Sequence, residues 1–307
     1  MRVAFFGSPD FALPSLLALN ERFDVALVVS QPDKAAGRGL KTRPPAVARV
    51  AAGLGLPLAQ PARLRNNSEF AERLAGLQPD VAVTVAYGKL LPQALLDLPR
   101  CGFLNVHASL LPKYRGAGPV QWALINGERV TGVTIMRTEA GLDTGPACLV
   151  RATEIADDER APELFGRLAQ LGARTIVEAL EKLSGGRLEC RPQDDAEATF
   201  APQLRREDGD LDWNQPAAAS YDRFRGVAGW PGTRFEFAAG EVRVFDMRPV
   251  DGAGQPGEVI GLSEAGVVVA TGEGALELLE LQPAGKRRMS ARAWANGYRV
   301  RMGATLA

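Results

Sequence analysis

The chain has 307 residues and a mass of 32.8 kDa, which is enough for two domains of ordinary size. Hydrophobic residues make up 46% of it, so a sizeable core can be buried and wholesale disorder is not expected. Lys plus Arg and Asp plus Glu both number 36, so the net charge is zero. Any attraction for a polyanion must therefore come from local clusters of cations.

The three cysteines, Cys101, Cys148 and Cys190, form no close pair in the sequence and have no metal-binding spacing. With one histidine in the chain, a structural zinc site is not expected. A sparse, odd number of cysteines is typical of a reducing compartment, so we expect a cytoplasmic protein. The apolar runs are too short for a signal peptide or a membrane span, so no membrane partner is expected.

Strands and helices are predicted to alternate through the first two thirds of the chain. Buried, β-branched runs predict strands at residues 2–7, 24–30, 80–86, 101–108 and 130–138. Helical spacing predicts helices at 11–20, at 69–77 with Ser68 as the N-cap, at 119–125 and at 162–183. This alternation is typical of a largely parallel, doubly wound α/β sheet, in which ligands bind beyond the carboxyl ends of the strands.

The pattern changes after about residue 190. A polar, proline-containing stretch reads as a linker, and short alternating segments follow at 234–237, 241–246, 257–262, 266–270 and 275–281. Short strands at this spacing, separated by glycine and proline, predict a small β-barrel or sandwich. We therefore expect one domain at residues 1–189, a linker at 190–205 and a second domain at 206–307.

The only histidine, His107, lies at the end of the strand predicted at residues 101–108, and Asn105 precedes it by two positions. Residues i and i+2 of a strand point to the same side, so the amide and the imidazole face one space. Two such groups suit a carbonyl whose oxygen gains negative charge when it is attacked. The alternative is that a lone histidine is an ordinary, half-buried residue.

Asp143 lies in the turn AGLDTG at residues 140–145, directly after the strand predicted at 130–138. We expect it on the same edge of the sheet as His107, where a carboxylate would orient the imidazole and stabilise its charged form. Asp also commonly caps turns, which would require no contact with His107. The loop LLPKYRG at 110–116 offers an apolar half that suits a flat ligand and a cationic half that suits an anion, or it is an ordinary surface loop.

Two segments carry many cations and no acid. Between Lys34 and Ser68, the cations are Lys34, Arg38, Lys41, Arg43, Arg49, Arg63 and Arg65. Residues 31–45 read as a long mobile loop with Arg38 at its tip. Near the C-terminus, the cations are Lys286, Arg287, Arg288, Arg292, Arg299 and Arg301. Contact with a phosphate backbone is one interpretation, and a solvated charged surface is the other.

Two common classes of site are disfavoured. The first strand ends in Gly7-Ser8-Pro9-Asp10, which has neither the G-x-G-x-x-G pattern of dinucleotide binding nor the lysine of a P-loop. The chain also has no nucleophile elbow of a Ser-His-Asp hydrolase.

Taken together, the motifs resemble the methionyl-tRNA formyltransferase family. They are FGSPDFA (6–12), QPD (31–33), GRG (37–39), VAYG (85–88), NVHASLLP (105–112), YRGA (114–117), GVTIM (132–136), GLDTG (141–145), WP (230–231) and LQPAGK (281–286). They extend from the first strand almost to the C-terminus. The asparagine, the histidine and GLDTG are shared with the wider group of enzymes that use 10-formyltetrahydrofolate, whereas the basic segments indicate a tRNA acceptor.

The resemblance implies a Rossmann-type formyltransferase domain followed by a small OB-like β-barrel that helps to hold tRNA. It implies transfer of a formyl group from 10-formyltetrahydrofolate to the α-amino group of methionyl initiator tRNA, for translation initiation and without a metal. A monomer is expected. Rival interpretations are a formyltransferase acting on glycinamide ribonucleotide or an amino sugar nucleotide, a 10-formyltetrahydrofolate hydrolase, and a non-catalytic RNA-binding protein.

The resemblance also implies roles for particular residues. Asn105, His107 and Asp143 would be catalytic. The folate-binding residues would be Val85, Tyr87, Leu90, Ser109, Leu110, Leu111, Pro112 and Gly141. The tRNA-binding residues would be Arg38, Lys41, Arg43, Lys286, Arg287 and Arg288.

Overall fold

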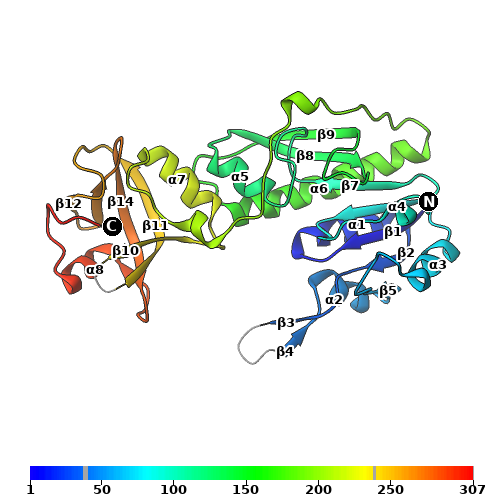
Figure 1. The fold of residues 1–307 in the computed structure, drawn as a ribbon, viewed down its shortest axis with the longest axis horizontal. Coiled ribbons are helices and arrows are strands. Elements are labelled where there is room, and N and C mark those ends of the chain that lie inside the picture. Colours follow the sequence, from blue (N-terminus) through cyan, green and yellow to red (C-terminus); the bar gives the residue numbers. More distant parts are fainter. Residues whose placement is uncertain (37–40, 238–239, 307) are drawn as a thin grey trace. The chain divides into compact units, whose positions relative to one another are not determined.

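A computed structural model describes residues 1–36, 41–237 and 240–306 of the chain, with the backbone alone at 34–36 and 41. The chain divides into two compact units (Figure 1). The first comprises residues 1–119, 130–155 and 164–202. The second comprises residues 120–129 and 156–163 together with the chain from Gln203 onward. No helix within the described ranges is both long and apolar enough to span a membrane.

The first unit is built on a seven-stranded sheet with the order β5-β2-β1-β6-β7-β8-β9. Its strands are β1 (Arg2–Gly7), β2 (Asp24–Val29), β5 (Leu58–Ala59), β6 (Val81–Val85), β7 (Phe103–His107), β8 (Val130–Arg137) and β9 (Ala147–Glu154). The five strands from β5 to β7 are parallel, as predicted, whereas β8 and β9 are antiparallel to their neighbours. Strand β9 was not predicted, because its side chains alternate between half-buried and exposed and form no buried run.

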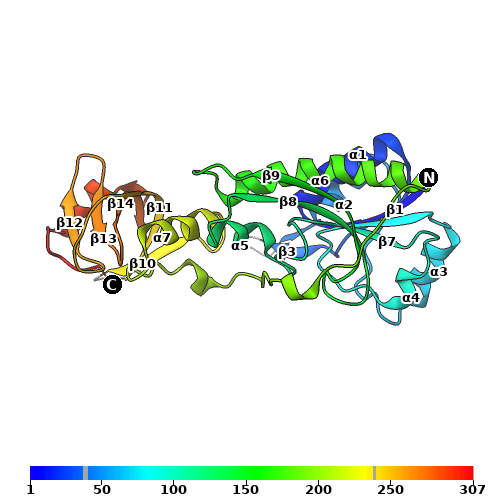
Figure 2. The ribbon, with the colours of Figure 1, turned by 90° about the horizontal axis from the view of Figure 1, so that it is seen from above.

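Helices cover both faces of this sheet. Figure 2 shows α1 (Leu13–Arg22) and α6 (Ala161–Ser184) on one face and α3 (Ser68–Gly76) and α4 (Gln93–Leu96) on the other. Phe6 and Phe103 pack with Phe70 of α3 and Leu95 of α4 in one apolar cluster. The N-cap of α3 is Asn67, whose side chain accepts from the backbone N–H of Phe70 at 3.0 Å, so the prediction of Ser68 was wrong.

Glycine 172 of α6 fixes which side of β7 faces that helix. A Cβ atom on Gly172 would lie 2.8 Å from Cγ1 of Val106, so α6 and Val106 are in close approach. Side chains alternate along a strand, so Asn105 and His107 lie on the opposite face from Val106.

A two-stranded antiparallel hairpin, β3 (Lys34–Ala36) and β4 (Lys41–Arg43), occupies much of the stretch that we predicted to be a long mobile loop. Helix α2 (Ala46–Gly53) begins three residues after β4. The hairpin corrects the loop prediction for residues 34–36 and 41–43, because backbone pairing orders them. Residues 37–40 lie outside the described part of the chain.

The second unit contains an antiparallel sheet with the order β10-β11-β14-β13-β12, and β15 pairs with β14. Its strands are β10 (Thr233–Phe237), β11 (Gly240–Val250), β12 (Val259–Leu262), β13 (Val267–Ala270), β14 (Ala275–Pro283) and β15 (Met289–Ser290). The predicted small β domain is confirmed, but no strand pairing among the described residues closes the sheet into a barrel. Two helices, α7 (Ala217–Gly226) and α8 (Ala291–Tyr298), were not predicted, and Trp294 of α8 is fully buried in the core.

Candidate active site

His107, the last residue of β7, is buried, with 5% of its surface exposed. Its Nε2 atom lies 2.9 Å from the carbonyl oxygen of Tyr114. A carbonyl oxygen can only accept a hydrogen bond, so Nε2 carries the proton and donates. The other ring nitrogen, Nδ1, therefore has a lone pair when the ring is neutral and is the atom that can gain a proton.

Asp143 faces that nitrogen. Its Oδ2 atom is 3.7 Å from Nδ1 of His107 and accepts a hydrogen bond from the backbone N–H of Gly116 at 2.9 Å. The separation of 3.7 Å is too long for a hydrogen bond, but the carboxylate is close enough to stabilise a charged imidazolium. The imidazole and the carboxylate thus lie together beside the end of β7.

The route by which Asp143 reaches His107 differs from our expectation. We placed Asp143 at the shared edge because it follows a strand that we took to end there. Strand β8 instead runs antiparallel to β7, so Arg137 lies opposite Leu104 while Thr134 lies opposite His107. The loop after β8 must therefore carry Asp143 back toward His107, and the strand direction in our reasoning was wrong.

Asn105 lies on the same face of β7 as His107 and is half-buried. The Thr84 hydroxyl of the neighbouring strand β6 donates to Oδ1 of Asn105 at 2.9 Å. No hydrogen bond of Nδ2 is found to any described residue, so this N–H₂ group is available to an oxygen of a ligand.

The loop after β7 is held by its own hydrogen bonds. Ser109 is fully buried and donates from its hydroxyl to the carbonyl of Lys113 at 2.6 Å. Thr134 of β8 donates to the carbonyl of Ser109 at 2.7 Å and accepts from the N–H of Leu111 at 3.1 Å. The peptide bond between Leu111 and Pro112 is cis. The side chains of Leu110, Leu111 and Pro112 remain partly exposed.

Arg115 corrects the interpretation of this loop's cationic half as a rim for an anion. Only 4% of its side chain is exposed. The guanidinium donates to Oε1 of Gln193 from Nε at 3.1 Å and from Nη2 at 2.8 Å, and Nη2 also pairs with Asp195 at 2.7 Å. The guanidinium of Arg115 is therefore engaged by residues of the first unit and is not offered to an anionic ligand.

The loop after β6 lies at the same edge as the loop after β7, because the two strands are parallel neighbours. Val85 and Tyr87 are buried, and the Tyr87 ring packs against Phe6 with centroids 5.5 Å apart. Burial raises the pKa of Tyr87 to about 12, and its hydroxyl has no hydrogen-bond partner among the described residues. In contrast, Leu90 is 75% exposed, so the predicted folate-binding residues of this loop divide into buried and exposed members.

The loop that carries Asp143 also presents open surface. Gly141 and Leu142 are exposed, and Leu142 is 55% exposed despite its apolar side chain. A Cβ atom on Gly141 would lie 2.2 Å from Oγ1 of Thr144, so the loop admits no side chain at this position without moving. Leu90 and Leu142 thus supply apolar surface on two loops of the first unit.

Residues 190–202, which read as linker from the sequence, belong to the first compact unit. Arg191 and Ala147 exchange backbone hydrogen bonds, and a disulfide joins Cys190 to Cys148 of β9. The spacing of these cysteines, 42 residues apart, did not predict this bond. Gln193 in the same segment donates to the carbonyls of Asp143 and Gly145, at 2.8 and 2.7 Å. Sequence reasoning missed Gln193.

The predicted tRNA-binding cations are distributed over both units. Arg43 is exposed on β4, and Lys286, Arg287 and Arg288 are exposed between β14 and β15. Arg288 pairs with Glu280 at 3.3 Å and stacks over the Phe245 ring at 3.6 Å. Arg38 and the side chain of Lys41 lie outside the described part of the chain. No cluster of His, Cys, Asp and Glu in the described ranges has a metal-binding arrangement.

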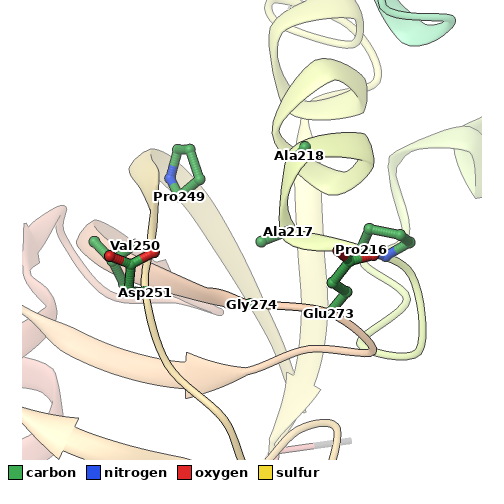
Figure 3. Close-up of a pocket in the computed structure, with 8 residues that line it drawn as sticks. All are labelled: Pro216, Ala217, Ala218, Pro249, Val250, Asp251, Glu273 and Gly274. Carbon is green, nitrogen blue, oxygen red and sulfur yellow. The ribbon is translucent and has the colours of Figure 1, made fainter.

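A hollow of about 470 Å³ lies in the second unit and is distinct from the His107 site (Figure 3). It is lined by Pro216, Ala217, Ala218, Pro249, Val250, Asp251, Glu273 and Gly274. Its two charged side chains are both carboxylates, which would repel a phosphate or the carboxylates of a folate. The hollow is therefore not a suitable binding site for an anionic ligand such as a folate.

The chain belongs to the formyl transferase family. Residues 1–180 match the family's formyl transferase model, and residues 203–299 match the model of its C-terminal domain. Within the family, similar relatives are methionyl-tRNA formyltransferases. The protein of that name from Deinococcus radiodurans is 52% identical, with 99% of this chain and 95% of the relative aligned. The one from Thermus thermophilus is also 52% identical, over 100% of this chain and 99% of the relative.

Solved structures of lower identity share the fold. WlaRD, a sugar 3N-formyl transferase, superposes with a TM-score of 0.68 at 13% identity, covering 91% of this chain and 97% of that protein. HypX from Aquifex aeolicus, solved in complex with tetrahydrofolic acid, gives a TM-score of 0.64 at 19% identity. The match to HypX covers 98% of this chain but 48% of HypX, so the present chain spans about half its length.

Proposed function

We propose that the protein transfers a formyl group from 10-formyltetrahydrofolate to the α-amino group of methionyl initiator tRNA, for translation initiation. The observations that carry the proposal are that Asn105 and His107 share one face of β7 and that the Asp143 carboxylate lies 3.7 Å from Nδ1 of His107. Full-length relatives of about 50% identity that are methionyl-tRNA formyltransferases support the choice of acceptor.

The donor supplies the carbonyl carbon that the methionyl amine attacks. An α-amino group has a pKa of about 8, so its neutral, nucleophilic form is accessible near neutral pH. The Nδ2 of Asn105 donates to the formyl oxygen and stabilises the charge that develops there. Asn105 is suited to this role because Thr84 already donates to its Oδ1 atom and orients the amide.

His107 then transfers the proton that the attacking amine loses. Its Nε2–H is engaged by Tyr114, so Nδ1 is the atom that accepts the proton of the attacking amine, directly or through water. The Asp143 carboxylate, 3.7 Å away, stabilises the resulting imidazolium. The same proton is afterwards available to the departing nitrogen of the folate, so one nitrogen serves both steps.

The first unit offers suitable surface for the folate. Leu90 and Leu142 are exposed apolar side chains, and Leu110 is half-buried in the loop after β7. Apolar side chains of this kind suit the faces of a flat pterin ring. We propose that Val85 and Tyr87, whose side chains are buried, contact the folate through their main chain, as Gly141 does. The remaining proposed contacts are Ser109, Leu111 and Pro112, and no metal is needed.

The cations at Arg38, Lys41, Arg43, Lys286, Arg287 and Arg288 are proposed to bind tRNA phosphates. In this view residues 1–189 catalyse the transfer and 206–307 help to hold the tRNA, while most of the predicted linker at 190–205 belongs to the first unit, which extends to Pro202. We further propose a cytoplasmic monomer. The exposure of Arg43 and of the three cations between β14 and β15 supports the tRNA contacts.

A single assay tests the function. The protein is incubated with labelled 10-formyltetrahydrofolate and charged initiator tRNA, with glycinamide ribonucleotide, an amino sugar nucleotide and water as competing acceptors. Label is expected on the methionyl group. Label on a competing acceptor, or formate release alone, would refute the proposal, and absence of folate binding would favour a non-catalytic RNA-binding protein.

A further inference from the structure

We infer that Gln193 is a positioning residue for Asp143, an inference that rests on the proposed function. It lies in a segment that sequence patterns mark as a linker and contributes no group of its own to the reacting atoms. Its side chain instead connects two loops that hold the acid–base pair. Its Nε2 atom donates to the carbonyls of Asp143 and Gly145, at 2.8 and 2.7 Å.

The orientation of the Gln193 amide is forced by its partners. Arg115 has only donors, so the atom that it contacts from Nε and Nη2 must be the amide oxygen. The two backbone carbonyls have only lone pairs, so the atom facing them must be the amide nitrogen. Glutamine satisfies both demands, whereas glutamate would satisfy Arg115 and offer no donor to the carbonyls.

The Asp143 loop requires such support. Asp143 has φ of 54°, in the left-handed region that residues other than glycine adopt at an energetic cost. The contacts of Gln193 lie on either side of the following turn, and the Gly116 N–H holds the carboxylate itself. Gln193 thus fixes the main chain of the residue whose carboxylate faces His107.

Gln193 can do this because its own main chain is anchored on both sides. Toward the N-terminus, Arg191 pairs with Ala147 and Cys190 is bonded to Cys148. Toward the C-terminus, the carbonyl of Thr199 accepts from the N–H of Arg115 at 2.8 Å. The amide is therefore presented from a segment fixed to β9 and to the loop after β7.

The decisive variant is Gln193→Glu, because it keeps the acceptor for Arg115 and removes the donors to the carbonyls. We expect kcat to fall about 10- to 100-fold, as for a catalytic group displaced by about 1 Å, with KM for both substrates changed less than about 3-fold. Gln193→Ala should reduce kcat similarly. The matched control is Gln93→Ala, which removes an exposed glutamine whose partner is Asp97, and it should leave kcat unchanged.

A double-mutant cycle separates positioning from general destabilisation. If Gln193 acts through Asp143, then Gln193→Glu should cause no further loss of kcat in an Asp143→Ala background. Losses that multiply, or an unchanged kcat in the single variant, would overturn the inference. Thermal melting of each variant shows whether it is folded.

Hydrogen exchange supplies a readout that does not require the reaction. Amides of residues 139–145 should exchange faster in Gln193→Glu than in wild type, while those of β6 and β7 should not change. Unchanged exchange in the loop would also overturn the inference. If wild type fails to formylate methionyl-tRNA, the proposed function fails, and the kinetic cycle is then run on whichever acceptor wild type uses.

Discussion

His107 donates from Nε2 to the carbonyl oxygen of Tyr114, 2.9 Å away, and this bond decides which nitrogen of the ring is available for chemistry. Nδ1 is left facing Asp143. Rotation of the ring to offer Nε2 elsewhere would break this buried hydrogen bond. In the proposed mechanism, His107 therefore moves a proton at Nδ1, and Asn105 stabilises the formyl oxygen.

Replacement of His107 by asparagine should reduce kcat about 10²- to 10⁴-fold, because the proton acceptor at Nδ1 is lost. KM for the folate should change little, since only 5% of the His107 surface is exposed. Steady-state kinetics with each substrate varied in turn measures both effects. An unchanged kcat would show that His107 has only a packing role.

Replacement of Asp143 by asparagine should lower kcat by about 10²-fold or more. An asparagine can still accept from the Gly116 N–H, so the loop remains held while the negative charge opposite Nδ1 is removed. The variant should melt near the wild-type temperature. A reduction smaller than about 3-fold would mean that the carboxylate does not assist the proton transfer.

Replacement of Tyr87 by phenylalanine should leave the free energy of unfolding within about 0.5 kcal/mol of wild type, or raise it, because the lost hydroxyl has no partner among the described residues. Denaturant unfolding at neutral pH measures this. KM for the folate should also be unchanged, since the phenol is buried against Phe6. A clear rise in KM would show that the folate reaches the side chain.

The same variant should alter the response to alkali. Burial raises the pKa of Tyr87 from 10.0 to about 12, so the folded state keeps a proton that the unfolded state has lost. The free energy of unfolding of wild type should therefore decrease as the pH rises from 10.0 toward 12. The decrease should be smaller in the phenylalanine variant, which lacks this titrating group. Tyr221, whose pKa is also raised to about 12, retains its own share in both proteins.

Replacement of Glu277 by glutamine should destabilise the second unit by about 1 kcal/mol at neutral pH. The buried carboxylate accepts from the Ser263 hydroxyl at 2.7 Å and pairs with Arg248 at 2.6 Å. These contacts lower the pKa of Glu277 below 4.5, so their contribution is complete above that pH and is lost as the pH falls through the lowered value. Urea unfolding across this range should show the two proteins converging in acid, and a difference independent of pH would contradict the charge-based explanation.

Replacement of Arg38 by leucine should raise KM for the tRNA and leave KM for the folate unchanged, because the proposed contact is with phosphate. The slope of log KM for the tRNA against log salt concentration should decrease by about 1, as for the loss of one phosphate contact. Arg22→Leu is a suitable control, since Arg22 pairs with Glu181 on the first unit. Equal effects of the two variants would show that the tRNA senses only overall charge.

Sequence patterns located the elements whose side chains repeat with a regular period. Strand β2, for example, covers Asp24–Val29 where a strand was expected at 24–30. Strand β9 forms no buried run, because it lies at the edge of the sheet and its side chains are half-buried or exposed. The direction of β8 was also beyond local patterns, since parallel and antiparallel neighbours can bury similar side chains.

The site was predictable where its residues are close in sequence and unpredictable where they meet through tertiary contacts. Asn105 and His107 share a strand, so their common direction follows from the pleat. Gln193 contacts residues 48, 50 and 78 positions away, and a polar stretch carries no hydrophobic period to place it. Arg115 was expected at the surface because charged side chains are usually exposed, and only its pairing with Gln193 and Asp195 explains its burial.

Three consecutive residues in the loop after β7 hold the side chains of the site. For this reason, the loop should tolerate substitutions better than insertions or deletions. The Tyr114 carbonyl holds the His107 ring, the Arg115 side chain holds the Gln193 amide, and the Gly116 N–H holds the Asp143 carboxylate. The Tyr114 contact comes from the main chain and does not depend on the side chain. The Gly116 contact also comes from the main chain, but a Cβ atom there would lie 2.6 Å from the Ala201 carbonyl oxygen, so this position requires glycine. Inserting or deleting one residue between 114 and 116 would shift at least one contact by a full residue, about 3.5 Å. Active variants should therefore tolerate replacements at Tyr114 more readily than any insertion beside it.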